Sequence, residues 1–518
     1  MVLLKNDKFD QELLAQVAPA DWTNPKPQAL YDMVVVGGGT AGLITAAIAA
    51  GLGAKVAMVE RELLGGDCLN YGCVPSKGLL SVSRRLGILR RGHDYGIAPA
   101  KGGADFGAVM ERMRRLRAGI SHHDGAARFT ELGVDVFLGT GRFTRENLLE
   151  VKPLGSDDKQ GSSNSNATGE TVTLKFKRAV IATGARPLVF PVPGLEDVPY
   201  LTNLSLFSLT ELPESMAIVG AGPIGVEMAQ AFVRFGCKVT IIAMDRHILP
   251  REDPEAAAVV QAALAKDGVV FELGAKMKSA EMRNGKRVVV FERDGEDREV
   301  VASELLLAMG RAANVDGLGL EDAGVEFDRR GIQVNDNLRS TNKRIFAAGD
   351  VAGSYQFTHA ADAMARLVIR NAFFFGRGKV SDLTMPWSTY TDPEVAHVGL
   401  YASESEKAGC ELATLRMDFA AIDRSILEGD TEGFAKVVFE KKSGKLRGAT
   451  VVGAHGGELL GEMLIAVNKR MKVTELSAII HPYPTSVSIW GRLGDQASGA
   501  RLTPSVAKLL KRIIGWRR

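Results

Sequence analysis

The chain has 518 residues, of which 46% are hydrophobic and 24% charged, the composition of a soluble globular protein. Because a single hydrophobic core stops growing at roughly 250–300 residues, this length predicts two to four domains. A formal net charge of +3 gives no case for nucleic-acid binding, and four cysteines are too few for a disulfide framework.

The first 30 residues are an N-terminal extension that precedes the first apolar strand. Met1–Leu14 has no apolar core followed by a cleavage site of small residues, so we expect a cytoplasmic protein without a secretion signal. Trp22, Pro25 and Pro27 indicate a linker with a single aromatic anchor.

Residues 31–60 carry the pattern of a dinucleotide site. An apolar strand over 31–36 leads into GGGTAG at 37–42, which fits G-x-G-x-x-G, and then into an alanine-rich helix. A second strand ends at Glu60, eighteen residues after Gly42, where a ribose-binding acid is expected at roughly 20. A glycine triplet alone would also fit a plain tight turn, but strand, helix and acid together indicate a bound dinucleotide.

Cys68 and Cys73 follow directly, in GGDCLNYGCVPSK at 65–77. A close cysteine pair in a chain with so few cysteines is catalytic, metal-binding or accidental. A closed structural zinc site needs a second pair of ligands, and none follows nearby in the sequence. The neighbouring dinucleotide pattern therefore favours a redox pair.

Residues 216–225 repeat the nucleotide pattern, with an apolar strand followed by GAGPIG, and a helix and strand are predicted within 226–242. Two such units imply two dinucleotides, or a duplicated domain with one inactive copy. Ala243 stands where the ribose-binding acid belongs. Asp245 would restore a preference for NADH, whereas Arg246 would favour NADPH, and the sequence leaves both open.

The later part of the chain first completes the nucleotide units and then changes composition. A strand over 341–350 ends in Asp350, whose carboxylate either points into the ligand crevice of a parallel sheet or caps the helix predicted at 360–373. Beyond Pro386 the sequence alternates as antiparallel strands do. The predicted strands are 389–400, 434–440 and 446–453, and the predicted helices 459–469 and 473–477.

In this order, GGDCLNYGCVPSK, the two glycine fingerprints, ATGARP, MGRAAN and FAAGD resemble the motifs of the flavin-dependent pyridine nucleotide–disulfide oxidoreductases. The resemblance covers about residues 31–495, in a family that includes dihydrolipoamide dehydrogenase, glutathione reductase and mercuric reductase. It implies an α/β fold with two Rossmann-like dinucleotide-binding domains and an α+β dimerisation domain. The expected parts are an extension (1–30), an FAD domain (31–185 and 311–385), an NAD(P) domain (186–310), a dimerisation domain (386–498) and a basic tail (499–518).

The resemblance also implies which residues bind the cofactors FAD and NAD(P)H. The expected FAD contacts are Gly37, Gly39, Gly42, Glu60, Lys77, Gly141, Thr183, Gly184 and Asp350. The expected NAD(P)H contacts are Gly220, Gly222, Gly225 and Gly310.

The cysteine pair takes its roles from the same resemblance. Cys73 is the sulfur next to the flavin, and Cys68 is the outer sulfur that meets the substrate. Lys77 is expected beside the flavin, paired with Glu227 on the helix of the second fingerprint. A buried ammonium group there stabilises negative charge on flavin and sulfur.

The C-terminal segment departs from the thiol-disulfide reductases of this family. These are homodimers in which a His-Pro-Thr segment, oriented by a glutamate, reaches the cysteine pair of the partner. Aligning on Thr485 places Tyr483 where that histidine belongs and Ser488 where the glutamate belongs. Tyrosine, with a pKa of about 10, is a poor proton shuttle near neutral pH. His481 is either a substitute base or a structural histidine.

Tyrosine at this place resembles the mercuric reductases, and Cys68 and Cys73 would serve as transient ligands of a soft substrate ion. Mercuric reductases carry a C-terminal Cys-Cys, whereas this chain has no cysteine after Cys410. We therefore expect a mercuric reductase-like enzyme that passes electrons to a soft metal ion or small electrophile. The alternatives are a thiol-disulfide reductase that uses His481 and a flavin-binding interaction protein without turnover.

The tail over 503–518 is basic and amphipathic. Such a segment either lies on a membrane surface as a peripheral contact, packs against the dimer, or is disordered. No other macromolecular partner besides a second copy of the chain is expected.

Overall fold

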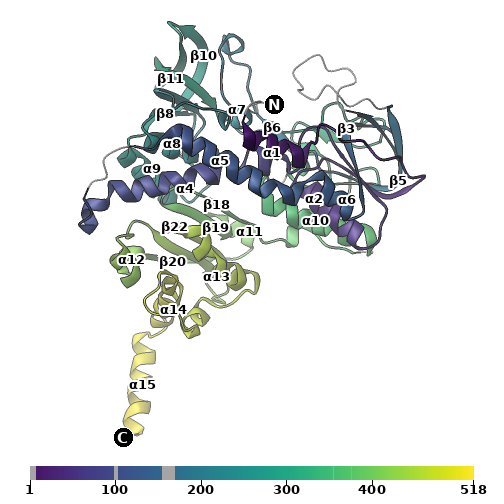
Figure 1. The fold of residues 1–518 in the computed structure, drawn as a ribbon. Helices are drawn as coiled ribbons and strands as arrows, with labels where there is room; N and C mark the ends of the chain where they lie inside the picture. Colours follow the sequence, from purple (N-terminus) through teal and green to yellow (C-terminus); the bar gives the residue numbers. More distant parts are fainter. Residues whose placement is uncertain (1–6, 99–102, 154–169, 354, 375, 518) are drawn as a thin grey trace. The chain divides into compact units, whose positions relative to one another are not determined.

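The computed structural model describes residues 7–98, 103–153, 170–353, 355–374 and 376–517, and its ribbon is drawn in Figure 1. The chain divides into two compact units. The first unit comprises Met1–Gly220, Ala231–Ile242 and Ala275–Leu383. The second comprises Ala221–Gln230, Ala243–Gly274 and Thr384–Arg518.

The first unit is built on a sheet whose five parallel strands lie in the order β3, β2, β1, β5, β17. Val35 of the central strand pairs with Met58 on one side and Val180 on the other. These strands read as nearly continuous runs of buried apolar residues, as is typical of parallel strands covered on both faces. Their bounds are β1 (Tyr31–Val36), β2 (Val56–Glu60), β3 (Val134–Arg145), β5 (Val172–Ile181) and β17 (Ile345–Ala347).

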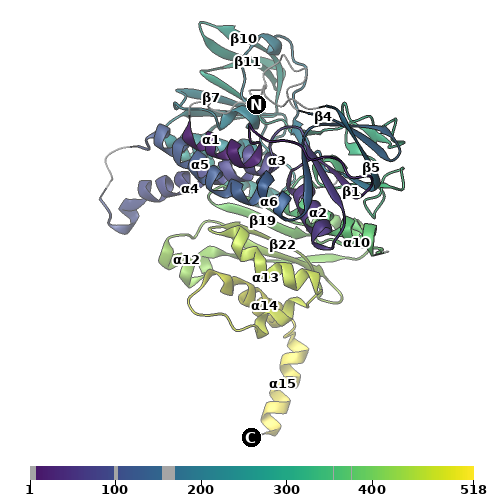
Figure 2. The same ribbon diagram turned by 45° about the vertical axis from the view of Figure 1, so that its right-hand side comes forward.

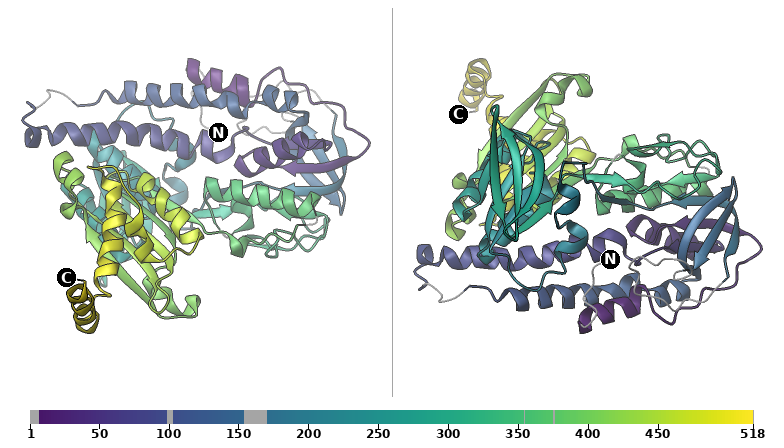
Figure 3. Two further views of the ribbon diagram at one scale, coloured as in Figure 1. Left: turned by 90° about the horizontal axis from the view of Figure 1, so that it is seen from below. Right: turned by 90° about the horizontal axis from the view of Figure 1, so that it is seen from above.

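Beyond the parallel part, β4 (Leu148–Pro153) pairs antiparallel with the extensions of β3 and β5. The helix α2 follows β1 and packs beside α10, and the long helices α4 and α5 lie side by side (Figure 3). The helices of this unit are α1 (Lys8–Val17), α2 (Thr40–Gly51), α3 (Gly66–Asn70), α4 (Cys73–Arg90), α5 (Phe106–Ser121), α6 (Ala126–Glu131), α7 (Asn203–Leu206) and α10 (Thr358–Phe373).

The second glycine fingerprint follows β7 (Ser215–Val219), which lies between β8 (Lys238–Ala243) and β13 (Glu304–Leu307) with all three strands parallel. The helix α8 (Pro223–Phe235) begins within the fingerprint. A separate antiparallel sheet is formed by β10 (Ala275–Arg283), β11 (Lys286–Arg293) and β12 (Glu296–Ala302). The segment between residues 188 and 310 is flanked by two short strands that pair antiparallel with each other, β6 (Ala185–Pro187) and β14 (Arg311–Ala313).

The second unit contains a five-stranded antiparallel sheet in the order β18, β19, β22, β21, β20. Its strands are β18 (Pro386–Thr389), β19 (Glu394–Gly399), β20 (Leu412–Asp418), β21 (Phe434–Glu440) and β22 (Leu446–Gly453). The strand predicted over 389–400 is therefore two strands, because the Asp392–Pro393 turn separates β18 from β19. Proline cannot donate to a strand ladder, which explains why the pairing stops there.

Two helices, α13 (Gly456–Asn468) and α14 (Ile489–Gly499), pack on this sheet and share one apolar core with it (Figure 2). Trp490 of α14 is fully buried in that core. The segment 473–477, predicted as a helix, is a 3-10 turn over Val473–Ala478. The remaining elements are α9 (Pro254–Asp267), β9 (Val270–Leu273), α11 (Ser405–Ala408), α12 (Asp423–Glu428) and α15 (Pro504–Trp516).

The N-terminal extension contributes a helix to the first unit. In α1 the Asp7 side chain accepts hydrogen bonds from the backbone N–H groups of Phe9 and Asp10, which fixes the start of the helix. Leu13 and Val17 are fully buried in the main core. Trp22 donates to the carbonyl of Val136 at 3.2 Å, so the predicted aromatic anchor fastens the linker to β3.

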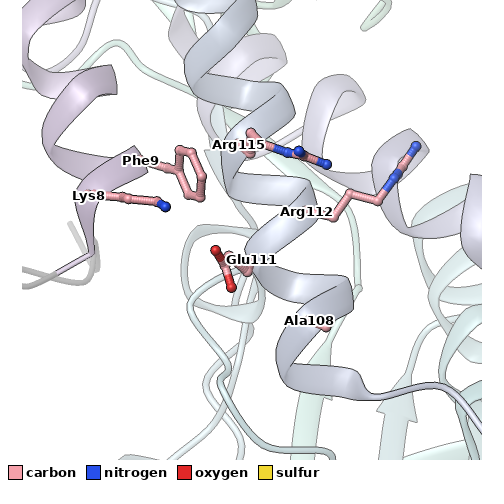
Figure 4. Close-up of a pocket in the computed structure, with 6 residues that line it drawn as sticks. All are labelled: Lys8, Phe9, Ala108, Glu111, Arg112 and Arg115. Carbon is pink, nitrogen blue, oxygen red and sulfur yellow. The ribbon is translucent and has the colours of Figure 1, made fainter.

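Two ion pairs join α1 to α5. Arg117 lies 2.5 Å from Asp10, and both side chains are 2% exposed. Arg114 lies 2.8 Å from Asp7. Beside these pairs the helices border a surface hollow of about 400 Å³, with Phe9 among charged side chains (Figure 4). Its lining residues are Lys8, Phe9, Ala108, Glu111, Arg112 and Arg115.

No helix within the described ranges is both long and apolar enough to cross a bilayer.

Replacing Asp10 tests the contact between α1 and α5. Asp10→Ala leaves the Arg117 guanidinium buried without its counter-charge, which costs about 3–5 kcal/mol for a buried ion pair. We expect faster amide hydrogen exchange in α1 and α5 than in the wild-type protein, because local opening becomes easier. The exposed Asp21→Ala is the matched control and should leave exchange unchanged. Equal exchange in both variants would contradict the assignment.

Candidate active site

The cysteine pair lies at the junction of two helices. Cys68 is in α3, and Cys73 is the first residue of α4. Both are free cysteines, with Cys68 half-buried and Cys73 exposed. The start of α3 packs against the first glycine fingerprint through a contact between two glycines. A Cβ on Gly66 would lie 2.7 Å from the Cα of Gly39. Only glycine at this point lets the dithiol approach the nucleotide loop so closely.

The two thiols have opposite acidities. The pKa of Cys73 is lowered to about 6 by a hydrogen bond from Cys68, by a hydrogen bond from Thr358 and by the charge of Lys77, although the protein atoms around the sulfur partly desolvate it and oppose this shift. The Thr358 Oγ1 lies 3.3 Å from the Cys73 Sγ. The pKa of Cys68 is raised by its hydrogen bond to Cys73 and by burial. In the dithiol state, Cys73 is therefore the thiolate and Cys68 the protonated partner.

A charged cluster surrounds the acid that precedes Cys68. Arg311 lies 3.2 Å from Asp67 and 3.3 Å from Asp350, so one guanidinium bridges two carboxylates. Asn203 donates to Asp67 at 2.8 Å. Burial raises the pKa of Asp350, and the charge of Arg311 opposes that rise.

The sequence identified Asp350 but not the residues around it. Asp350 opens a short 3-10 turn, whereas α10 begins at Thr358 after Phe357, so Asp350 does not cap that helix. The helix predicted from residue 360 starts two residues earlier, which is how Thr358 was missed. Arg311 stood in the MGRAAN motif without an assigned role, although its place after a strand end was a usable signal.

The N-terminal extension reaches this site indirectly. Arg117, held by Asp10, donates to the carbonyl of Asn70 at 2.9 Å. The Asn70 side chain in turn donates to the carbonyls of Leu64 and Gly66. Asn70, which lies between the two cysteines, is therefore held through both its carbonyl and its side chain.

The first fingerprint has the geometry of a dinucleotide loop. Gly37 has φ +108°, and a Cβ there would lie 2.4 Å from the carbonyl oxygen of Ala182. A Cβ on Gly42 would lie 1.8 Å from the carbonyl oxygen of Gly37. Gly39 caps α2 without a side chain, which leaves the helix N-terminus open to a phosphate.

The acid after the second strand completes this loop. The Glu60 carboxylate accepts hydrogen bonds from the N–H groups of Gly38 and Glu62, both at 2.6 Å. It is buried, and burial raises its pKa. These residues fit the adenosine half of FAD. Direct FAD contacts by these residues and by Gly141, Thr183 and Gly184 remain predictions, with Gly141 in β3 and Thr183 donating to the carbonyl of Asn314.

The second fingerprint shows the same backbone signature at its start. Gly220 has φ +116°, and a Cβ there would lie 2.3 Å from the carbonyl oxygen of Ala308. Gly310 has φ +119°. NAD(P)H contacts at these two positions and at Gly222 and Gly225 remain predictions.

The partner of Lys77 and the nucleotide preference are also still predictions. Glu227 is buried on α8 and accepts a hydrogen bond from the backbone N–H of Tyr390 at 2.9 Å. Its pairing with Lys77 remains a prediction. Asp245 and Arg246 are both exposed after β8, so NADH and NADPH both stay open.

In the C-terminal segment, histidine and tyrosine have different surroundings. His481 lies 3.0 Å from Glu462 of α13, and its side chain is only 9% exposed. Tyr483 is 78% exposed and donates to Asp423 at 3.1 Å, which raises its pKa. The Ser488 hydroxyl donates a hydrogen bond to the carbonyl of Thr485 within the same turn. Sequence reasoning missed Glu462, which lies nineteen residues before its histidine.

The part of the chain that the structure describes contains no cluster of metal ligands. Within the described ranges, no group of three or more His, Cys, Asp or Glu residues could hold an ion. Cys237 is buried, and burial raises its pKa to about 12.

The acidity of Cys73 can be titrated directly. We expect the ultraviolet thiolate absorbance of the reduced protein to rise with a midpoint near pH 6, and Cys73→Ser to abolish this step. The thiolate is present above that pH and protonated below it. Lys77→Met and Thr358→Val should each move the midpoint upwards, because each removes an interaction that favours the thiolate. A midpoint that is the same in both variants and the wild type would refute this account.

Comparison with known proteins agrees with this architecture. Residues 31–365 match the family described as pyridine nucleotide-disulphide oxidoreductase, and residues 385–492 match its dimerisation domain. Dihydrolipoyl dehydrogenase from Bacillus subtilis (strain 168) is 31% identical over 475 residues, covering 90% of this chain and 98% of the relative. Mercuric reductase from Streptomyces lividans is 33% identical over 460 residues, covering 88% and 94%.

Solved structures give the same result. LpdA from Mycobacterium tuberculosis matches with a TM-score of 0.80 and 26% identity, covering 90% of this chain and 99% of that one. A Cu(II) complex of the HOCl-induced flavoprotein disulfide reductase RclA from Escherichia coli matches with a TM-score of 0.77 and 25% identity, covering 90% and 100%. The expected fold class is confirmed, and the chain belongs to the pyridine nucleotide-disulphide oxidoreductases, a family of FAD- and NAD(P)H-dependent enzymes.

Proposed function

We propose that this protein is a homodimeric NAD(P)H-dependent flavoenzyme whose Cys68–Cys73 pair reduces a soft metal ion or a small electrophile. The observation that carries the proposal is the surroundings of His481 and Tyr483. His481 is largely buried against Glu462, and the tyrosine at the place of the usual acid–base histidine has a raised pKa. Relatives named mercuric reductase, and the RclA structure with Cu(II), agree with such an acceptor.

Proton supply distinguishes the two classes of acceptor. Reduction of a disulfide releases a thiolate leaving group that a nearby acid must protonate. A soft metal ion bound by two thiolates accepts electrons without a proton from the protein. An exposed tyrosine with a raised pKa is a weak acid at neutral pH, so the segment suits the second kind of acceptor better.

The residues that would hold FAD are those of the first fingerprint, with Glu60 at the ribose and Asp350 at the far end of the crevice. When bound, FAD would supply the hydride-accepting chemistry and would pass the two electrons to the disulfide form of the Cys68–Cys73 pair, or to an ion held by its dithiol form. This chain contributes the thiolate at Cys73, stabilised by Cys68, Thr358 and Lys77. Cys68 is then the sulfur that meets the acceptor.

A disulfide reductase is the second candidate, favoured by the ion pair between His481 and Glu462 at 3.0 Å. A carboxylate next to a histidine fixes the orientation of its ring, as a general acid–base residue requires. The relatives named dihydrolipoyl dehydrogenase agree with this alternative. The ion pair between His481 and Glu462 would have to open before the imidazole ring could reach a substrate, since little of that ring is exposed.

Mercury-dependent NADPH oxidation tests the main proposal. We expect Hg(II) to stimulate turnover of the purified FAD-loaded protein, and Cys68→Ser to lower that rate on the order of 10³-fold, because one of the two thiolate ligands is lost. Cys410→Ser, a half-buried cysteine outside the site, is the matched control. Stimulation that persists in Cys68→Ser would exclude acceptance at the dithiol.

The alternative is tested with a panel of disulfides, including lipoamide and glutathione disulfide. If His481 is the acid–base group, His481→Ala should lower the rate about 10²–10⁴-fold, and Glu462→Gln should lower it as well because the ring loses the carboxylate that orients it. The main proposal instead expects little disulfide turnover in the wild type and no rate effect of either change on the metal reaction. A large loss of disulfide reduction in His481→Ala, with bound FAD retained, would replace the main proposal by the alternative.

A further inference from the structure

The helix α15 has an apolar face that none of the described part of the chain covers. No residue of Pro504–Trp516 is buried. The exposed apolar side chains are Val506, Leu509, Leu510, Ile513, Ile514 and Trp516, between 40% and 96% exposed. The start of the helix is encoded locally, because Thr503 caps it and Pro504 occupies its first turn.

The side chains separate into two faces. With 3.6 residues per turn, the apolar positions at 506, 509, 510, 513, 514 and 516 occupy roughly half of the circumference. Lys508, Lys511 and Arg512 lie on the other half, with Ser505 and Gly515. From Ala497 to Arg518 the sequence contains six Lys or Arg residues and no Asp or Glu. The helix is therefore amphipathic, and all of its charged side chains are cations.

We propose that α15 binds the surface of an anionic lipid bilayer, with its apolar face in the headgroup region and its cations towards lipid phosphates. An apolar half bordered by Lys and Arg is the composition of interfacial helices. Thirteen residues span about 20 Å, which is short of a bilayer core of about 30 Å, so the helix lies on the membrane rather than across it. A helix of this length is marginal alone in water, and a lipid surface supplies the missing burial.

Other binding partners match the two faces of α15 less well than a lipid surface does. A second copy of α15 would bring cations against cations, since the tail has no acid to pair with them. Nucleic acid would satisfy the cations but would leave the apolar half exposed to water. A lipid surface of negative charge satisfies both halves at once.

Flotation of the full-length FAD-loaded protein with lipid vesicles tests this proposal. We expect binding to vesicles of phosphatidylcholine with phosphatidylglycerol, little binding to phosphatidylcholine alone, and weakening by added salt. Ile513→Asp should weaken binding about 10- to 150-fold, because it removes a large apolar group from the buried face. Lys511→Gln should weaken it about fivefold.

The matched control is Ser505→Asp, which adds the same charge to the polar half of the helix. Ser505→Asp should weaken binding to the anionic vesicles about fivefold, which is the effect of one charge and is smaller than the loss expected for Ile513→Asp. Equal losses in both variants, or no binding to either kind of vesicle, would overturn the proposal. So would a change of oligomeric state in Ile513→Asp, which would assign the apolar face to contacts between copies. Turnover with an artificial electron acceptor should be unchanged in every variant, which shows that the catalytic part is intact.

Discussion

The hydrogen bond between the Cys68 and Cys73 thiols is the interaction on which the site depends. Sharing one proton between two sulfurs lowers the pKa of Cys73 and raises that of Cys68, so the pair carries one negative charge rather than none or two. This asymmetry requires both sulfurs to stay in contact. A five-residue helix, a glycine and the first turn of α4 hold them in that position.

The surrounding fold explains why the pair can remain in this geometry. The carbonyl of Asn70, between the cysteines, accepts a hydrogen bond from Arg117, whose other contact is the buried Asp10. The glycine contact between Gly66 and Gly39 ties the same turn to the nucleotide loop. A helix from the N-terminal extension and the first dinucleotide loop thus converge on one short backbone segment. Contacts within the protein itself therefore hold this segment in place.

Much of this arrangement could be predicted from local sequence, because the strongest features are backbone requirements. The strand, glycine loop, helix and acid around Gly37 and Glu60 depend on short-range geometry, and the strands and helices there agree with prediction within a few residues. The helix α1 was not predicted, because the cations that pair with its two acids, Arg114 and Arg117, lie about a hundred residues away in the sequence. Partners far apart in sequence, such as Arg311 with Asp67 or His481 with Glu462, leave no local periodicity to detect.

Asp67 shows how such distant partners decide the chemistry. Its negative charge lies beside both cysteines and raises the pKa of each, which disfavours the thiolate form. Arg311 and Asn203 both bind this carboxylate, and Arg311 also pairs with Asp350. A bound guanidinium offsets the charge that the thiolate would otherwise face at short range. Arg311 thus connects the carboxylate beside the dithiol with that of Asp350.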